Sequence, residues 1–374
     1  MASPTRKTTS KSTIFKVVLI LLTITMILIV AALIFGKRQT NISDDDVTEE
    51  SGDATTSDSA AETLDEGEIV DISTSKYTYD MFSSDVSELC EKYPNAISYE
   101  KMGLSYDGRD IMHLDLGSKE AAHHILIVGP VRGNEYAYSK LLMKMAENYA
   151  SSYDVGEYEG TTYADIFNNV EVQMIPMPNP DGATIAQEGI DGIASEELKE
   201  AVRSCYEIDK FNLSHELSDD GEYSWVDHSE EGGYNVLLSD NPEMIEMYEY
   251  TKLWEGNAYG IDLMKNFEVN WDNIESRSNP SYKGYKGPGA MSDVETALLY
   301  TMAVDKEYDM IVIFGSKSTS SETSSLEDFV VNVLGTDCRI WSFPDDSESL
   351  AGDLPEIYNE NIELIAGMAK ECMN

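Results

Sequence analysis

The chain has 374 residues, 42% of them hydrophobic, which is enough to bury the core of one large α/β domain or two smaller ones. Its formal net charge is −43, and a surface this acidic would repel a nucleic-acid backbone. The composition therefore excludes nucleic acid as a partner. It does not identify a basic ligand, because strong acidity more often provides solubility.

The first recognisable element is an uncharged, apolar run at residues 17–35. As a helix rising about 1.5 Å per residue it would cross a bilayer core. Basic residues are frequent within residues 1–16, whereas only Lys37 and Arg38 follow the run, so the positive-inside rule places the N-terminus in the cytoplasm. We therefore expect a single-pass anchor in the cell membrane, with the C-terminal part extracytoplasmic. A cleaved signal peptide is the alternative, but the run is longer than a usual h-region and no small-x-small cleavage site follows it.

The next segment, residues 36–75, is predicted to be a disordered acidic linker. From Gln39 onward it is rich in Ser, Thr, Asp and Glu and contains no basic or aromatic residue. Such a segment cannot bury enough apolar surface to offset the entropy lost on ordering. No repeat or second linker follows, so residues 76–374 are expected to form one extracytoplasmic domain. The anchor, the acidic linker and the positive-inside asymmetry together indicate a bacterial envelope protein.

Strand and helix patterns alternate within residues 76–374. This alternation predicts an α/β/α sandwich around a central mixed sheet, with the ligand site at the carboxyl ends of the strands. The expected helices cover residues 82–93, 141–149, 294–304 and 362–372, and the expected strands cover residues 97–104, 111–116, 125–128, 170–177, 310–314 and 339–343.

The strand at residues 125–128 is followed by a polar loop that ends at Glu135 and opens onto a helix. A buried β-branched strand that ends in Gly129-Pro130 is typical of a strand that delivers a functional loop to a helix N-terminus. Arg132 lies in this loop, at a position where a short metal-binding pair would need His, because a guanidinium group cannot coordinate a metal.

Several motifs follow one another in a recognisable order. They are Gly108-Arg109, Gly133-Asn134-Glu135, Ile-Pro-Met-Pro-Asn-Pro-Asp-Gly at residues 175–182, Gly-Ile-Asp-Leu at residues 260–263 and Tyr285-Lys286-Gly287. In order and spacing, from about Tyr77 to the C-terminus, the chain resembles the carboxypeptidase A-like zinc metallocarboxypeptidase family. It is most similar to the bacterial branch that includes γ-D-glutamyl-meso-diaminopimelate peptidases. The resemblance implies the family fold and its cofactor, a zinc ion held by two His and one Glu, with another Glu as general base.

Most positions that carry this chemistry are substituted. The first ligand pair, His-x-x-Glu in the family, reads Arg132 to Glu135 here, and Gly315 stands where the second His is expected. No carboxylate ends the strand at residues 339–343, where the general base belongs. Lys265 replaces the Arg that binds the substrate carboxylate, and Glu255 replaces a basic residue.

The resemblance therefore implies a family fold from which zinc and catalysis have been removed. Glu135 is interpreted as a remnant zinc ligand, and one carboxylate does not supply the three protein ligands of a catalytic zinc. We expect no catalytic residue, no metal site and no cofactor. His215 with Glu216, or His228 with Glu230, is an alternative metal pair, although exposed loop histidines are the simpler interpretation.

Arg132 is expected to occupy the former zinc position as an ion pair with Glu135, since an unpaired carboxylate in a partly buried pocket is costly. The alternative is that Arg132 points to solvent. With Lys265 and Lys317 it would form a positive, substrate-binding cleft for a carboxylate-bearing peptide or a peptidoglycan stem. A scaffold whose working surface lies elsewhere is the competing interpretation.

Three functions of different classes remain. The first is a membrane-anchored, extracytoplasmic carboxypeptidase-like pseudoenzyme that binds or scaffolds peptide or peptidoglycan-type ligands. The alternatives are an active metallocarboxypeptidase with a rearranged zinc site and a structural surface domain. The four cysteines allow three pairings into two disulfides in an exported domain, with free buried thiols as the alternative: Cys90, Cys205, Cys338 and Cys372.

Overall fold

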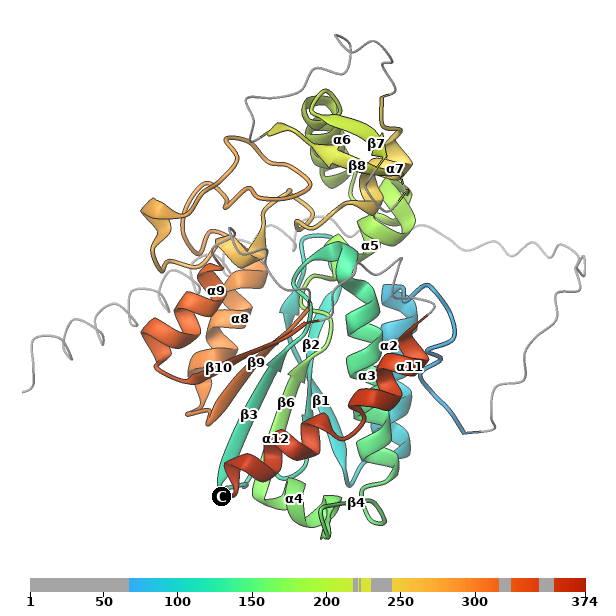
Figure 1. Ribbon diagram of the computed structural model, residues 1–374, viewed down its shortest axis with the longest axis vertical. Helices are drawn as coiled ribbons and strands as arrows, with labels where there is room; N and C mark the ends of the chain where they lie inside the picture. The colour runs from blue at the N-terminus through green and yellow to red at the C-terminus, as the bar shows by residue number, and fades with distance from the viewer. Residues whose placement is uncertain (1–66, 218–220, 222, 230–243, 316–323, 343–352) are drawn as a thin grey trace, which may run out of the picture. The chain divides into compact units, whose positions relative to one another are not determined.

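A computed structural model describes residues 67–374 except 218–220, 222, 230–243, 316–323 and 343–352. Its centre is a six-stranded mixed sheet with the order β1-β2-β6-β3-β9-β10 (Figure 1). The strands are β1 (Ile97–Leu104), β2 (Asp110–Leu116), β3 (His123–Val128), β6 (Val170–Ile175), β9 (Met310–Phe314) and β10 (Asp337–Trp341). Strands β6, β3, β9 and β10 run parallel, and β2 is antiparallel to both of its neighbours. The predicted mixed sheet is confirmed.

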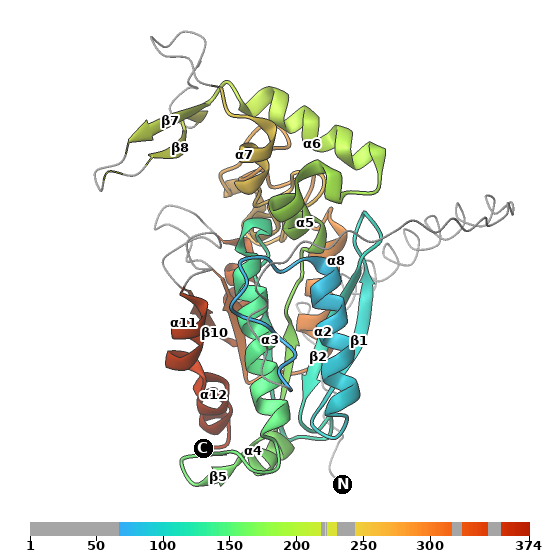
Figure 2. The same cartoon turned by 90° about the vertical axis from the view of Figure 1, so that its right-hand side faces the viewer.

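Helices cover both faces of the sheet (Figure 2). The inner strands are apolar on both sides, so alternate residues of one strand enter different cores: Ile125 and Ile127 face one, Leu126 and Val128 the other. One face packs against α2 (Tyr79–Lys92), α3 (Tyr136–Ser151), α4 (Tyr163–Asn169), α11 (Leu354–Asn361) and α12 (Leu364–Cys372). The other packs against α8 (Val294–Asp305), α9 (Ser325–Asp328) and the π-helical turn Phe329–Leu334. This is the predicted α/β/α sandwich.

A third core lies beyond the carboxyl ends of the parallel strands (Figure 1). It is centred on Trp254, Tyr250 and Val202, all fully buried. We call the elements around it the insertion: α6 (Glu196–Asp209), β7 (Leu213–Leu217), β8 (Tyr223–Asp227) and α7 (Met247–Lys252), which follow α5 (Pro180–Glu188). The polar sequence of the insertion did not predict these elements. The remaining short elements are β4 (Glu157–Tyr158), β5 (Thr161–Thr162) and 3-10 turns at Gly133–Glu135, Gly189–Gly192, Leu263–Lys265 and Trp271–Asn273.

The N-terminal end of the described chain packs along α3. Glu147 of α3 accepts hydrogen bonds from the backbone amides of Ile69 at 2.7 Å and Val70 at 3.1 Å, and Val70 is fully buried. The folded unit therefore begins before Lys76, because the end of the predicted linker contributes to the core. The predicted membrane span at residues 17–35 lies outside the described residues. Within the described ranges, no helix is both long and apolar enough to cross a bilayer.

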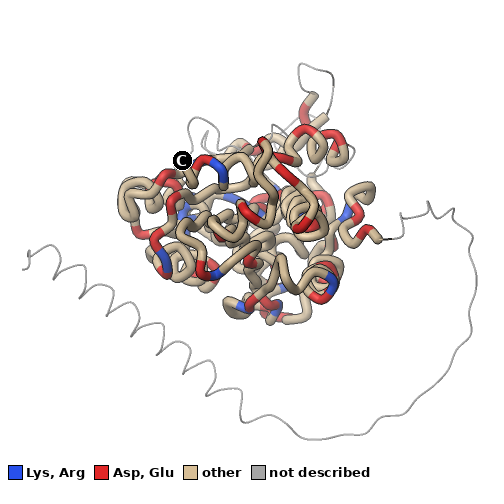
Figure 3. Tube along the Cα trace, turned by 90° about the horizontal axis from the view of Figure 1, so that it is seen from below, with Lys and Arg blue, Asp and Glu red and all other residues tan. Residues whose placement is uncertain are grey.

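All four cysteines are free thiols. Burial raises the pKa of the Cys205 thiol to about 12, which keeps it in the unreactive protonated form. The structure thus agrees with the alternative of free thiols and contains neither of the two predicted disulfides. Acidic residues are spread over many helices and loops (Figure 3), as expected for a surface whose acidity provides solubility.

Candidate functional site

The loop after β3 lies where the carboxyl ends of the parallel strands meet. Gly129 N–H donates to Ile175 O of β6 at 2.9 Å, and Gly315 N–H donates to Trp341 O of β10 at 3.0 Å. Gly133 is required for close approach, since a Cβ there would lie 2.4 Å from the Gly182 carbonyl carbon and 2.8 Å from Trp254 O. The loop is therefore held by backbone on several sides.

The family motifs form the frame of this loop. Asn179 Nδ2 donates to Val131 O at 2.8 Å and to Gly256 O at 3.1 Å, and so joins the loop to the segment after Trp254. Arg109 Nη1 lies 2.8 Å from Asp181 Oδ1 and links the β1–β2 turn to the start of α5. These contacts give the motifs a structural role that needs no catalytic chemistry.

Arg132 lies between two carboxylates. Its Nη1 is 3.6 Å from Glu135 Oε1, and its Nε is 3.2 Å from Glu255 Oε2. The Arg132 side chain is 12% exposed and Glu135 is buried. The expected Arg132–Glu135 ion pair is present, and the alternative in which Arg132 points to solvent is excluded. The second partner of Arg132, Glu255, was not predicted. The available signal was that an acidic residue stands where the family has a basic one.

Gly315 adjoins the same cluster. A Cβ at Gly315 would lie 2.7 Å from Glu135 Oε2, so the residues aligned with all three zinc-ligand positions converge in space. The cavity between them has a volume of only about 10 Å³, room for no more than about one water molecule. It is lined by Val131, Arg132, Glu135, Met264, Ile313, Phe314 and Gly315.

These residues do not fit a catalytic zinc ion. Such an ion needs three protein ligands from His, Glu, Asp or Cys and an open position for water. Glu135 is the one ligand type at the three aligned positions, and its carboxylate already faces a guanidinium. In the part of the chain that the structure describes, no group of three His, Cys, Asp or Glu side chains is arranged to hold a metal.

The histidines are engaged elsewhere. In β2 and β3, His113 lies 3.3 Å from Asp115, His123 lies 3.3 Å from Asp309 and His124 lies 2.9 Å from Glu171. In the insertion, His228 Nε2 lies 2.8 Å from Glu216, and His215 stacks on Trp225 with ring centroids 4.8 Å apart. Glu230, the other suggested partner of His228, lies outside the described residues.

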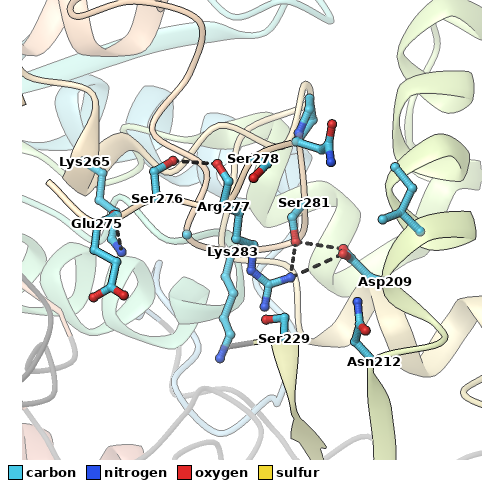
Figure 4. Close-up of a pocket in the computed structure, with 14 residues that line it drawn as sticks. Asp209, Asn212, Ser229, Lys265, Glu275, Ser276, Arg277, Ser278, Ser281 and Lys283 are labelled. Atoms are coloured by element: carbon cyan, nitrogen blue, oxygen red, sulfur yellow. Dashed lines mark hydrogen bonds and ion pairs between the residues drawn. The ribbon is translucent and has the colours of Figure 1, made fainter. Parts of the chain in front are cut away.

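Lys265 lies in a different cavity from Arg132. It ends the 3-10 turn Leu263–Lys265, whose start is capped by Asp262 accepting from Met264 N–H at 3.0 Å. Its side chain lines a pocket of about 320 Å³, which we call the lysine pocket, and its Nζ donates to Glu275 O at 3.3 Å (Figure 4). Lys317, the third predicted cation, lies outside the described residues.

The wall of the lysine pocket is built around Arg277. The guanidinium donates to Ser281 Oγ at 2.7 Å and to Asp209 Oδ1 at 3.3 Å, and it also pairs with Asp227. These carboxylates compensate its charge. Lys283 Nζ lies 3.9 Å from Asp227 and extends along the pocket wall beside Ser229 (Figure 4). Lys265 and Lys283 are therefore the cations of this pocket with the least compensated charge.

Neither Lys283 nor Arg277 was predicted from the sequence as a pocket residue. The signal for Lys283 is the repeat Tyr282-Lys283-Gly284 directly before the family motif Tyr285-Lys286-Gly287. Only the tertiary structure shows that Lys283 reaches the pocket of Lys265, because the two residues lie on separate loops.

A family model described as zinc carboxypeptidase matches residues 83–324. The chain belongs to the zinc carboxypeptidase family. The resemblance seen in the motifs is thereby confirmed, and the substitutions at Arg132 and Gly315 are departures within a true member of the family.

Two relatives and one solved structure illustrate the range of the family. An uncharacterized protein, YqgT, of Bacillus subtilis (strain 168) is 21% identical over 231 residues, 61% of this chain and 50% of that protein. Carboxypeptidase B of Astacus astacus is 31% identical over 110 residues, 29% of this chain and 34% of that protein. The matches thus span half or less of these relatives. The crystal structure of thrombin activatable fibrinolysis inhibitor matches with a TM-score of 0.50 at 12% identity, over 79% of this chain and 74% of that chain, which shows the shared fold alone.

Proposed function

We propose that this chain is a non-catalytic member of the zinc carboxypeptidase family, anchored in the membrane with its domain outside the cell, that binds carboxylate-bearing peptides such as peptidoglycan stems. The observation that carries the proposal is the position of Arg132, whose guanidinium lies between Glu135 and Glu255 beside a cavity of about 10 Å³.

The loss of catalysis follows from the chemistry of the residues at the former metal site. A guanidinium group donates hydrogen bonds but does not coordinate a metal, and Gly315 offers no side chain at the second ligand position. The positive charge of Arg132 stands in for the zinc ion, because it neutralises the carboxylate of Glu135. The fold is thus kept without the metal.

The lysine pocket supports the binding part of the proposal. Lys265, at the position of the family's carboxylate-binding residue, and Lys283 line the same cavity, which is large enough for one or two amino-acid residues. Ammonium groups beside hydroxyl groups are suited to a peptide carboxylate. On a very acidic protein, the two lysines would make this pocket a local region of positive potential that attracts an anionic ligand.

The first experiment measures zinc and hydrolysis. Purified full-length protein, equilibrated with zinc and desalted, is expected to hold less than about 0.1 zinc per chain by elemental analysis. It should release no residue from C-terminal peptides or stem peptides. An Arg132→His/Gly315→His variant should gain zinc affinity while remaining inactive for lack of a general base. One tightly held zinc per wild-type chain together with hydrolysis would establish the alternative, an active enzyme with a rearranged site.

The second experiment measures binding by isothermal titration. Stem peptides with a free C-terminal carboxylate should bind, and the same peptides with an amidated C-terminus should bind about tenfold more weakly. Lys265→Ala and Lys283→Ala should each weaken binding. Lys101→Ala is the matched control, since this lysine lies on β1 and its side chain is 58% exposed. Absence of heat with every peptide would reject the binding role and favour a structural surface domain.

A further inference from the structure

Another large cavity is lined in part by residues of the insertion. It has a volume of about 410 Å³, a size typical of small-molecule sites, and shares no lining residue with the lysine pocket. Its walls come from the N-terminal segment before α2, the loop after β3, strand β8 and helix α7. Because β8 and α7 belong to the insertion, this cavity exists only through the insertion. We call it the aromatic cleft.

Three aromatic rings line the aromatic cleft: Tyr136, Trp225 and Tyr248. One face of Trp225 is held by the ring of His215, with centroids 4.8 Å apart and an angle of 21° between the planes. This stacking sets the orientation of the Trp225 ring. Tyr248 is 58% exposed, which is high for a large aromatic residue beside a cavity. Oriented and partly exposed aromatic faces offer stacking surfaces to a ligand.

One residue that lines the cleft carries a hydrogen-bond acceptor without a donor. Asn134 Oδ1 is buried and has no hydrogen-bond partner among the described residues. A buried polar atom left unsatisfied costs free energy, which a ligand O–H or N–H would recover. Asn134 is a lining residue of the cleft, and a ligand donor that reached Oδ1 would satisfy this acceptor.

The charged side chains that line the cleft are Lys76, Glu249 and Lys252. Lys252 pairs with Glu249 at 3.2 Å, and its ammonium lies 4.9 Å from the centre of the Tyr248 ring. A strongly anionic ligand would be repelled by the protein around the cleft, whose formal net charge is −43. The cleft therefore favours a neutral ligand that combines apolar C–H faces with several hydroxyl donors.

Saccharides have this combination, since the C–H groups of a pyranose ring form a flat apolar face and its hydroxyl groups surround it. We propose that the aromatic cleft binds a neutral oligosaccharide, with one sugar ring stacked on Trp225 or Tyr248 and a hydroxyl or acetamido N–H donating to Asn134 Oδ1. This site is independent of the peptide site proposed above and uses none of its residues.

The test is a titration of full-length protein with chitotetraose and with cellotetraose, followed by calorimetry and tryptophan fluorescence. Saturable binding below about 1 mM is expected for at least one of them. Trp225→Ala and Tyr248→Ala should each weaken it by about tenfold. Leu217→Ala is the matched control, because this residue lies on the paired strand β7 and, like Tyr248, is 58% exposed, but it does not line the cleft. The sugar affinity of this variant should change less than about twofold.

Two results would overturn the proposal. One is the absence of saturable binding of either sugar up to about 10 mM. The other is wild-type affinity in Tyr248→Ala, a variant that is expected to fold because the side chain it truncates is mainly exposed. Binding of cellotetraose as strong as that of chitotetraose would support hydroxyl groups as the recognised donors, and a preference for chitotetraose would support the acetamido group. The Lys265→Ala variant, which should bind carboxylate peptides more weakly, should bind the sugars with unchanged affinity. Failure of the peptide site and failure of the sugar site can therefore be told apart.

Discussion

Replacing Arg132 by Met removes the cation from a cluster that the fold keeps largely out of water. The guanidinium lies 3.6 Å from Glu135 and 3.2 Å from Glu255, and the two side chains are 6% and 19% exposed. Methionine fills a similar volume without charge or polar hydrogen atoms. The variant therefore leaves two neighbouring carboxylates without their shared cation, while the surrounding backbone contacts of Gly133 and Asn179 remain.

The expected loss of stability can be bounded from these distances. Each contact corresponds to a gross attraction of about 5 kcal/mol at an effective dielectric constant of about 20. Desolvation of the charges cancels much of this, and measured losses for breaking buried pairs are about 3–5 kcal/mol. Because Glu255 is partly exposed, we expect the lower end, about 3 kcal/mol, or a fall of roughly 6 °C in Tm for a chain of this size.

The loss should depend on pH. In the variant, the adjacent carboxylates favour uptake of a proton in the folded state more than in the unfolded state. Proton binding by the folded state stabilises it as the pH falls, so the deficit relative to wild type should be smaller at pH 5 than at pH 8. Calorimetric or circular-dichroism melts of full-length protein at both pH values measure this difference.

A compensating variant is the control. Arg132→Met combined with Glu135→Gln removes the buried negative charge together with its cation and should recover most of the lost stability. If Arg132→Met melts within about 1 °C of wild type at pH 8, Arg132 does not stabilise the buried carboxylate of Glu135, and this prediction is refuted.

Three further predictions concern the frame of the site and the N-terminal segment. Gly133→Ala should destabilise the protein by about 2 kcal/mol because its Cβ would meet fixed backbone, whereas Gly289→Ala, with no atom within 4 Å, should be neutral in the same thermal melts. Burial raises the pKa of Asp85 to about 6, so the wild-type protein loses stability as the pH rises through about 4–6. The Asp85→Asn variant should therefore have a higher Tm than wild type at pH 8 and lose this advantage at pH 4. Glu147→Gln should weaken the acceptor of the Val70 amide, and hydrogen exchange at that amide should accelerate without a comparable change in β3; equal protection in both proteins would contradict the contact's role.

Much of the fold could be predicted because its signals are local. The run at residues 125–128 is apolar at every position, which indicates a strand buried on both faces, and the structure places it between β6 and β9. The loop motifs predicted the family because they hold backbone together, as Asn179 does between Val131 and Gly256. The Arg132–Glu135 pair was also predictable, since the two residues are three positions apart in one short turn.

Most elements of the insertion were not predicted because they have little apolar periodicity of their own. Helix α6 was not predicted either, although Leu198, Val202 and Cys205 recur at helical spacing on its buried face. Strand β8 is half-exposed, and helix α7 has only six residues. These segments are stabilised by a shared core around Trp254 and Tyr250, to which distant parts of the chain contribute. Local propensity carries no information on such contacts.

The sequence by itself determined the family, the sandwich and the identity of the residues at the positions of the family's zinc ligands. Only the tertiary structure decided how charge is distributed among them. It brought Glu255 to the second side of Arg132, although they are far apart in the chain, and it separated Lys265 from Arg132 into different cavities. The physical reason is that the sequence gives the type of each side chain and its neighbours along the chain. Which charged side chains pair and how deeply they are buried depends on which loops the sheet brings together at the carboxyl ends of its strands.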